Sequence, residues 1–144
     1  MRGNKIILST IFLFCLSCIY AQDTTIIKTD KIKSSCFCVK GIKLYRTKNS
    51  LDSSCLKHCK DYDFSKIDLS KNNLISILCT SGGCAPPIVN CILYKIASEK
   101  KYLFLIKIAA QGKCKANIPI PIVELVPKLE NDYIFEYTVE ESSL

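Results

Sequence analysis

Cysteine number and position constrain this chain more than any other feature of its sequence. The 144 residues include ten cysteines, of which Cys15 and Cys18 lie in an apolar N-terminal stretch. An exported chain folds in an oxidising compartment, where an even number of cysteines predicts a disulfide framework. We therefore expect four disulfides and no free thiol beyond that stretch. The cysteines concerned are Cys36, Cys38, Cys55, Cys59, Cys79, Cys84, Cys91 and Cys114.

The N-terminal stretch itself predicts export. Residues 1–21 read MRGNKIILSTIFLFCLSCIYA, in which Arg2 and Lys5 precede an apolar run. This pattern is typical of a secretory signal peptide, which we expect to be cleaved after Ala21. An uncleaved membrane anchor is the alternative, but the run of about fifteen residues is shorter than the ~20 of a spanning helix. We expect a secreted, extracellular protein that does not span a membrane.

The rest of the chain is short enough for one domain. Residues 22–35 are polar, and we expect a flexible N-terminal segment there, followed by a single disulfide-stabilised β-rich domain at 36–144. Alternating apolar and polar residues predict strands in this domain. The alternation is clearest at 133–139, where Tyr133, Phe135 and Tyr137 share one face. The strand-like runs are 39–47, 73–79, 88–96, 102–109, 118–126 and 133–139.

Prolines and a helix signal complete the expected fold. Pro119, Pro121 and Pro127 cannot donate ladder hydrogen bonds, so we expect their strand at a sheet edge. The stretch SLDSSCLKHCKDY at 50–62 is expected to form one short helix that begins at Ser50 or Asp52. About six strands and one helix predict a mainly β fold, either a small disulfide-rich β-sandwich or an open barrel.

Spacing ranks the possible disulfides. In an extended segment Cys36 and Cys38 would lie about 7 Å apart. On the predicted helix Cys55 and Cys59 would lie about 6 Å apart along the axis. Because the two spacings match, we expect these four cysteines to pair with one another, in either order.

Three of the other four cysteines lie in the stretch CTSGGCAPPIVNC at 79–91. The glycine pair at 82–83 permits a tight reversal that would join Cys79 to Cys84. Elimination then pairs Cys91 with Cys114, since a hairpin over 88–109 would bring both residues to one end of the sheet.

Charge is unevenly distributed along the chain. Nine basic residues between Lys28 and Lys60 stand against only Asp30 and Asp52, whereas the segment after Ala116 is acidic and holds one base, Lys128. A basic face would suit an extracellular protein or an acidic polysaccharide. The alternative is that the two halves face each other or are merely solvated. Nucleic acid is not expected as a partner. The candidate binding residues are Lys40, Lys43, Arg46 and Lys48.

These features favour a secreted, disulfide-stabilised binding protein that acts on an extracellular macromolecule. One alternative is a protease inhibitor, whose reactive loop would be the proline-stiffened, cysteine-bounded CAPPIVNC. Another is a carrier that holds an apolar ligand between two sheets. The loop residues that would contact a partner are Ala85, Pro86, Pro87 and Ile88.

Catalysis and metal binding are not expected. His58 is the single histidine, and the sequence lacks the common hydrolase, phosphate-loop and dinucleotide motifs. The stretches CFC and CLKHC could bind zinc, but export favours disulfides over thiolates. Asp61, Asp63 and Ser65 begin like a calcium loop, yet Lys66 stands where glycine is required. We expect a protein that is not an enzyme and that holds no cofactor or metal.

Two stretches resemble known families. CTSGGCAPPIVNCILYKI, followed by YLFLIKI, resembles the membrane-proximal calf-2 β-sandwich of integrin alpha subunits over about residues 75–109. That resemblance implies a local Cys79–Cys84 disulfide and an upstream partner for Cys91, against the pairing reached by elimination. CKANIPIPIV at 114–123 is similar to the closing strand of MD-2-related lipid-recognition domains. The integrin resemblance implies a β-sandwich.

Overall fold

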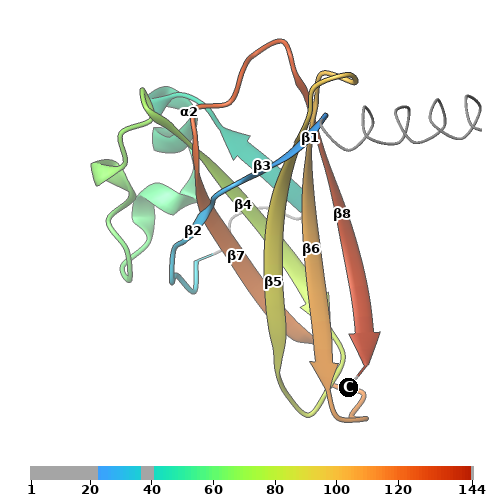
Figure 1. Ribbon diagram of the computed structural model, residues 1–144. Coiled ribbons are helices and arrows are strands. Elements are labelled where there is room, and N and C mark those ends of the chain that lie inside the picture. Colours follow the sequence, from blue (N-terminus) through green and yellow to red (C-terminus); the bar gives the residue numbers. More distant parts are fainter. Residues whose placement is uncertain (1–22, 37–40, 144) are drawn as a thin grey trace, which may run out of the picture.

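The computed structural model describes residues 23–36 and 41–143, which form a β-sandwich of two four-stranded sheets (Figure 1). The first sheet has the order β1-β5-β6-β8 and the second sheet has the order β2-β7-β4-β3. This confirms the predicted β-sandwich, while the predicted signal peptide lies outside the described residues. The strands are β1 (Thr24–Ile27), β2 (Asp30–Lys31), β3 (Gly41–Tyr45), β4 (Asn72–Ser81), β5 (Ala85–Ile96), β6 (Lys101–Gln111), β7 (Ile118–Pro127) and β8 (Ile134–Ser143).

The two sheets enclose the main hydrophobic core. Strand β6 alternates regularly, with Tyr102, Phe104 and Ile106 fully buried between the sheets and the intervening leucines on the outer face. The facing side chains of the second sheet, such as Ile77 and Ile122, are buried against them. The period of two in this part of the sequence therefore sets which side chains are inside.

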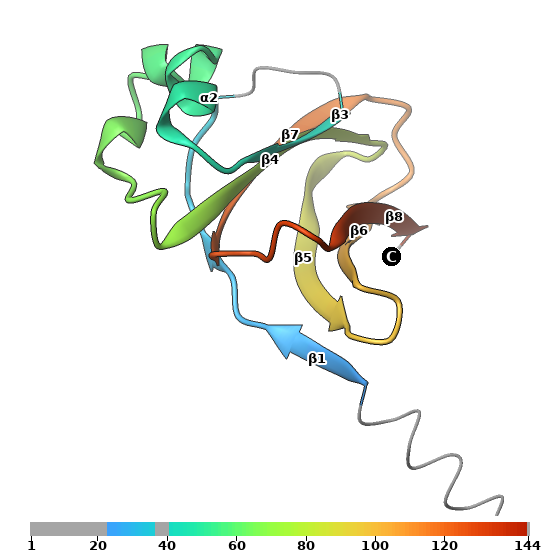
Figure 2. The same cartoon turned by 90° about the horizontal axis from the view of Figure 1, so that it is seen from above.

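The helical part of the chain forms a third layer on the outer face of the second sheet. It consists of α2 (Lys48–Asp52) and two 3₁₀ turns, η1 (Cys55–His58) and η2 (Phe64–Lys66), which Figure 2 shows gathered on one side of β3 and β4. Leu56 and Phe64 of these turns are buried with Tyr45 and Leu74 in a second core. Both faces of β4 are covered in consequence, which explains why residues 74–78 show no clean alternation.

The expected single helix at 50–62 is wrong in its boundaries. Helix α2 begins earlier, because Thr47 caps it in a capping box with Ser50. It ends before the cysteines, and Cys55 starts the separate turn η1. The serine pair at 53–54 stops the helix, since Ser54 binds the carbonyl oxygen of Leu51 through its own hydroxyl group.

The segment at 22–35, which we expected to be flexible, contains two short strands. All four residues of β1 pair with β5, and the two residues of β2 pair with β7. The segment therefore crosses from the first sheet to the second. The polar sequence of this segment does not predict strands, because β1 and β2 are held in extended form by pairing with the longer strands β5 and β7.

Strand β7 is not a free edge, contrary to the prediction from its prolines. It pairs with β4 over ten residues and with β2 at Glu124 and Leu125 only. Pro119, Pro121 and Pro127 all lie where β4 is the single neighbouring strand. No second strand there needs a hydrogen bond from the N–H groups that these prolines lack. The physical reason for the prediction holds, but the short strand β2 covers the rest of that side.

The C-terminal acidic segment pairs with bases of the first sheet. Strand β8 is parallel to β6, and the alternation predicted for 133–139 is confirmed by the register. Glu136 and Glu140 of β8 lie 3.4 and 3.7 Å from Lys101 and Lys107 of β6. Glu130 similarly pairs with Lys95 at 2.8 Å. These carboxylates therefore do not neutralise the basic segment at 28–60.

Candidate binding site

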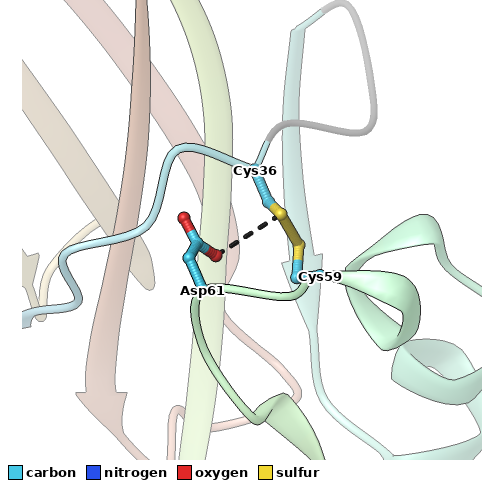
Figure 3. Close-up of side chains that lie close together, drawn as sticks. All are labelled: Cys36, Cys59 and Asp61. Atoms are coloured by element: carbon cyan, nitrogen blue, oxygen red, sulfur yellow. Dashed lines mark hydrogen bonds between the residues drawn. A yellow bond between two sulfur atoms is a disulfide. The ribbon is translucent and has the colours of Figure 1, made fainter.

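A disulfide between Cys36 and Cys59 joins the N-terminal segment to the helical layer, with the two Cα atoms 5.9 Å apart (Figure 3). This confirms one pairing within the predicted group of four. Cys55 is also disulfide-bonded, while Cys38 lies outside the described residues. The disulfide holds the end of η1 against the chain that leads into β3.

Asp61 also joins the N-terminal segment to the helical layer, through hydrogen bonds. Its carboxylate accepts hydrogen bonds from the Ser34 hydroxyl at 2.9 Å and from the backbone N–H and hydroxyl of Ser35 at 2.5 and 2.7 Å. The hydrogen bonds from Ser35 and Ser34 lower the pKa of Asp61. Figure 3 shows this carboxylate beside the sulfur of Cys36. Because the two sulfurs are bonded to each other, this cluster offers a metal no thiolate.

The second disulfide differs from the prediction. Cys84 pairs with Cys114, with Cα atoms 4.9 Å apart, so the predicted pairs Cys79–Cys84 and Cys91–Cys114 are both wrong. Strand β4 continues through Ser81, which keeps Cys79 in an extended ladder opposite Ile120 rather than in the turn. The chain reverses only at the glycine pair that follows.

Two glycines explain why Cys84 meets Cys114. A Cβ atom on Gly83 would lie 2.8 Å from the carbonyl oxygen of Gln111, and one on Gly112 would lie 2.8 Å from the sulfur of Cys84. Both glycines have positive φ. The loops β4–β5 and β6–β7 can therefore touch, and Cys84 N–H donates to the Gln111 carbonyl at 2.7 Å.

Cys79 and Cys91 remain as thiols, contrary to the expectation that no thiol would be free. Cys79 is buried on β4, and Cys91 is partly buried on β5 against the same core. Burial raises the pKa of the Cys79 thiol. Burial and the neighbouring Glu124 raise the pKa of Cys91 to about 12, so neither thiol is a ready nucleophile at neutral pH.

The predicted loop Ala85–Ile88 is the first part of strand β5. Ala85 pairs with Gln111 and Ile88 with Ala109, and a register shift between them absorbs Pro86 and Pro87. Ile88 is 57% exposed on the outer face of the first sheet. The segment is thus a bulged strand bound to β6, and it does not project as a loop of the kind an inhibitor presents.

The basic residues predicted to bind a partner are only partly brought together. Lys40 lies outside the described residues. The Lys43 ammonium lies 5.2 Å from the ring centroid of Tyr45 on the outer side of β3. Arg46 and Lys48 line a pocket of about 520 Å³, together with Asp68, Ser70 and Lys128 among others. We call this the basic pocket.

Lys128 is the residue of this pocket that the sequence did not reveal. It lies in the acidic C-terminal segment, but its ammonium donates to the carbonyl oxygens of Arg46 and Leu69 at 2.7 and 2.6 Å. Arg46 in turn donates to the carbonyl oxygens of Leu129 and Glu130 and to the side chain of Asn131. The two cations therefore fix the loop after β7 to the end of β3.

The basic pocket carries net positive charge. Within the described residues Arg46, Lys48 and Lys128 form no ion pair, and the hydrogen-bond acceptors of Arg46 and Lys128 are neutral oxygens. Asp68 is the one carboxylate of the lining, and hydrogen bonds from Ser70 lower its pKa. It also lies 3.8 Å from Lys71 outside the lining. The arrangement suits an anionic group of a ligand.

A second pocket of about 350 Å³ opens between the sheets beside β8, and we call it the inter-sheet pocket. Tyr137 and Val139 of β8 line one side, and Ile77 to Thr80 of β4 line the other, with Gly41 at the end of β3. The two β8 side chains line this pocket and are 44% and 42% exposed.

Glu124 is a carboxylate buried between the sheets, with 3% of its surface exposed. The hydroxyl of Thr29 and the thiol of Cys91 hydrogen-bond to it, and Lys31 lies near enough to interact electrostatically. Burial outweighs these interactions and raises the pKa of Glu124 above its ordinary value of 4.5.

Glu124 should make stability fall as the pH rises. A raised pKa in the folded state means that the folded protein binds this proton more tightly than the unfolded chain does. The free energy of unfolding of wild type, relative to Glu124→Gln, should therefore decrease from about pH 4.5 upward, through the folded pKa of Glu124. Urea unfolding of both proteins at several pH values measures this difference. Parallel pH profiles would show that Glu124 does not titrate differently on folding.

The fold and the two disulfides described above, Cys36–Cys59 and Cys84–Cys114, define a small disulfide-containing β-sandwich protein. Comparison of the chain with protein-family models, curated proteins and solved structures finds no match. The resemblances to integrin calf-2 and MD-2-related domains accordingly stay predictions. Within residues 23–36 and 41–143, no helix is long and apolar enough to cross a membrane.

Proposed function

We propose that this chain is a secreted, disulfide-stabilised binding protein that recognises an acidic extracellular macromolecule through the basic pocket. The observation that carries this proposal is the cluster of Arg46, Lys48 and Lys128 around a pocket whose single carboxylate, Asp68, is already engaged. Acidic polysaccharides and acidic protein segments both present the anionic groups that such a cluster attracts.

The geometry supports this function in two further ways. Arg46 and Lys128 are held by backbone oxygens, so little side-chain entropy remains to be lost when a ligand binds. Glu130, Glu136 and Glu140 of the C-terminal segment pair with lysines of the first sheet, so these carboxylates do not oppose the positive charge of the pocket.

The test is charge reversal at Lys48. Lys48 is exposed at the first position of α2, where a glutamate would interact favourably with the helix dipole, so the fold should tolerate Lys48→Glu. Affinity for a heparin oligosaccharide, measured by titration calorimetry at physiological ionic strength, should fall about tenfold. The loss should shrink as added salt shortens the screening length below about 8 Å.

A matched control reverses a lysine elsewhere. Lys113 is exposed in the loop after β6, at the other end of the sandwich from α2 (Figure 1). Lys113→Glu changes the net charge equally and should leave heparin affinity within about twofold of wild type. Equal losses for the two variants would indicate diffuse attraction to net charge and would contradict a site at the basic pocket.

A further inference from the structure

The outer edge of the first sheet is a complete strand with one side free. Strand β8 pairs with β6 over ten residues without a register shift, and no other described strand lies beside it (Figure 1). It holds no proline, lysine or bulge, and its only charged side chains are those of Glu136, Glu140 and Glu141. Three of the five large apolar side chains that are exposed in the described chain lie on it: Ile134, Tyr137 and Val139.

The free edge is ordered at both ends. The N–H of Ile134 donates to the carbonyl oxygen of Lys100 at 2.8 Å. At the other end the Glu141 carboxylate accepts from the Ser81 hydroxyl at 2.7 Å and from the N–H of Gly82 at 3.3 Å. Because β8 is held before any partner arrives, an added strand would not have to order it.

Alternation decides which backbone groups are free. The N–H of Ile134 points toward β6, so the N–H groups at even-numbered positions of β8 point the same way. Those of Phe135, Tyr137 and Val139 point to the open side. The side chains of Tyr137 and Val139 line the inter-sheet pocket next to these groups.

Charge selects the kind of partner. Glu136 and Glu140 lie on the outer face of β8, and each is about half exposed despite its lysine neighbour on β6. A second copy of this chain, paired antiparallel about Thr138, would place each of these glutamates opposite the other, which is unfavourable. Basic side chains on an added strand would instead form ion pairs with Glu136 and Glu140.

We propose that β8 binds an extended peptide segment of a partner protein as an added strand, with apolar side chains over the inter-sheet pocket and basic side chains beside Glu136 and Glu140. Main-chain hydrogen bonds along the edge supply affinity in this mode, and the pocket and carboxylates supply specificity. This site lies apart from the basic pocket and takes a ligand of opposite charge.

The probe is a synthetic peptide of about eight alternating lysine and valine residues, a normal strand length. It should bind the intact chain and shift the backbone amide resonances of Phe135, Tyr137 and Val139 more than those of their even-numbered neighbours. A peptide of alternating glutamate and valine should bind at least tenfold more weakly. Preference for the acidic peptide, or shifts elsewhere on the molecule, would overturn the proposal.

Substitutions at Val139 separate the backbone from the side chain. Val139→Pro removes a free edge N–H but no hydrogen bond to β6, so the fold should persist while affinity for the lysine–valine peptide falls about tenfold. Val139→Thr keeps that N–H and should lose less. Equal affinities of Val139→Pro and wild type would overturn the proposal, as would dimerisation of the chain through β8. Lys48→Glu should not alter peptide binding, so this proposal and the heparin proposal can fail separately.

Discussion

Replacing both Cys84 and Cys114 with alanine is expected to lower the free energy of unfolding by about 3.5 kcal/mol. The disulfide closes a loop with a sequence separation of 30 residues, and its removal restores the conformational entropy of that loop in the unfolded chain. It also releases the contact between the loops that follow β4 and β6. Urea unfolding of the double variant beside wild type measures the loss.

The pairing itself can be checked without substitutions. Proteolysis of the oxidised protein should yield one disulfide-linked fragment that contains Cys84 and Cys114. A fragment that links Cys79 to Cys84 would restore the local loop predicted from the sequence and would contradict this account. The loops after β4 and β6 would then touch at Gly83 and Gln111 without a disulfide to join them.

Replacing Phe104 with alanine is expected to cost about 3–5 kcal/mol of unfolding free energy. Phe104 is fully buried on β6 in the middle of the inter-sheet core, and its ring centroid lies 6.5 Å from that of Phe135 on β8. Its removal leaves a cavity that rigid strands on both sides cannot close. A small domain has about 5–15 kcal/mol of stability in total, so the variant should be near the limit of folding.

Leu105→Ala is the matched control for Phe104→Ala. Leu105 follows Phe104 on the same strand, but it lies on the outer face and is only partly buried. Its replacement should cost about 1 kcal/mol or less. If Leu105→Ala proved the more damaging of the two, the assignment of the inner and outer faces of β6 would be reversed.

The two proposed sites would let the chain bridge ligands of opposite charge. The basic pocket lies by α2 and the free edge lies along β8, on different sheets of the sandwich. If both sites bind, heparin and the lysine–valine peptide should bind the protein together rather than compete.

Local pattern alone determined most of the long strands. The runs at 73–79, 88–96, 102–109, 118–126 and 133–139 all correspond to strands, because alternation and β-branched residues act within one segment. The sequence also predicted that Cys36 would pair within the group of four cysteines. The spacing between Cys36 and Cys38 matches that between Cys55 and Cys59, which limited the possible partners of Cys36.

Contacts between distant segments decided the rest. Strands β1 and β2 exist because β5 and β7 offer them free edges, and short polar segments carry no sign of such neighbours. Cys84 meets Cys114 because two glycines let separate loops touch, and cysteine spacing cannot report that approach. Lys128 lies beside Arg46 and Lys48 because the pairing of β7 with β4 brings the end of β7 close to the end of β3. Sequence periodicity acts over a few residues, whereas these contacts span about 30 to 80 residues and depend on which strands pair.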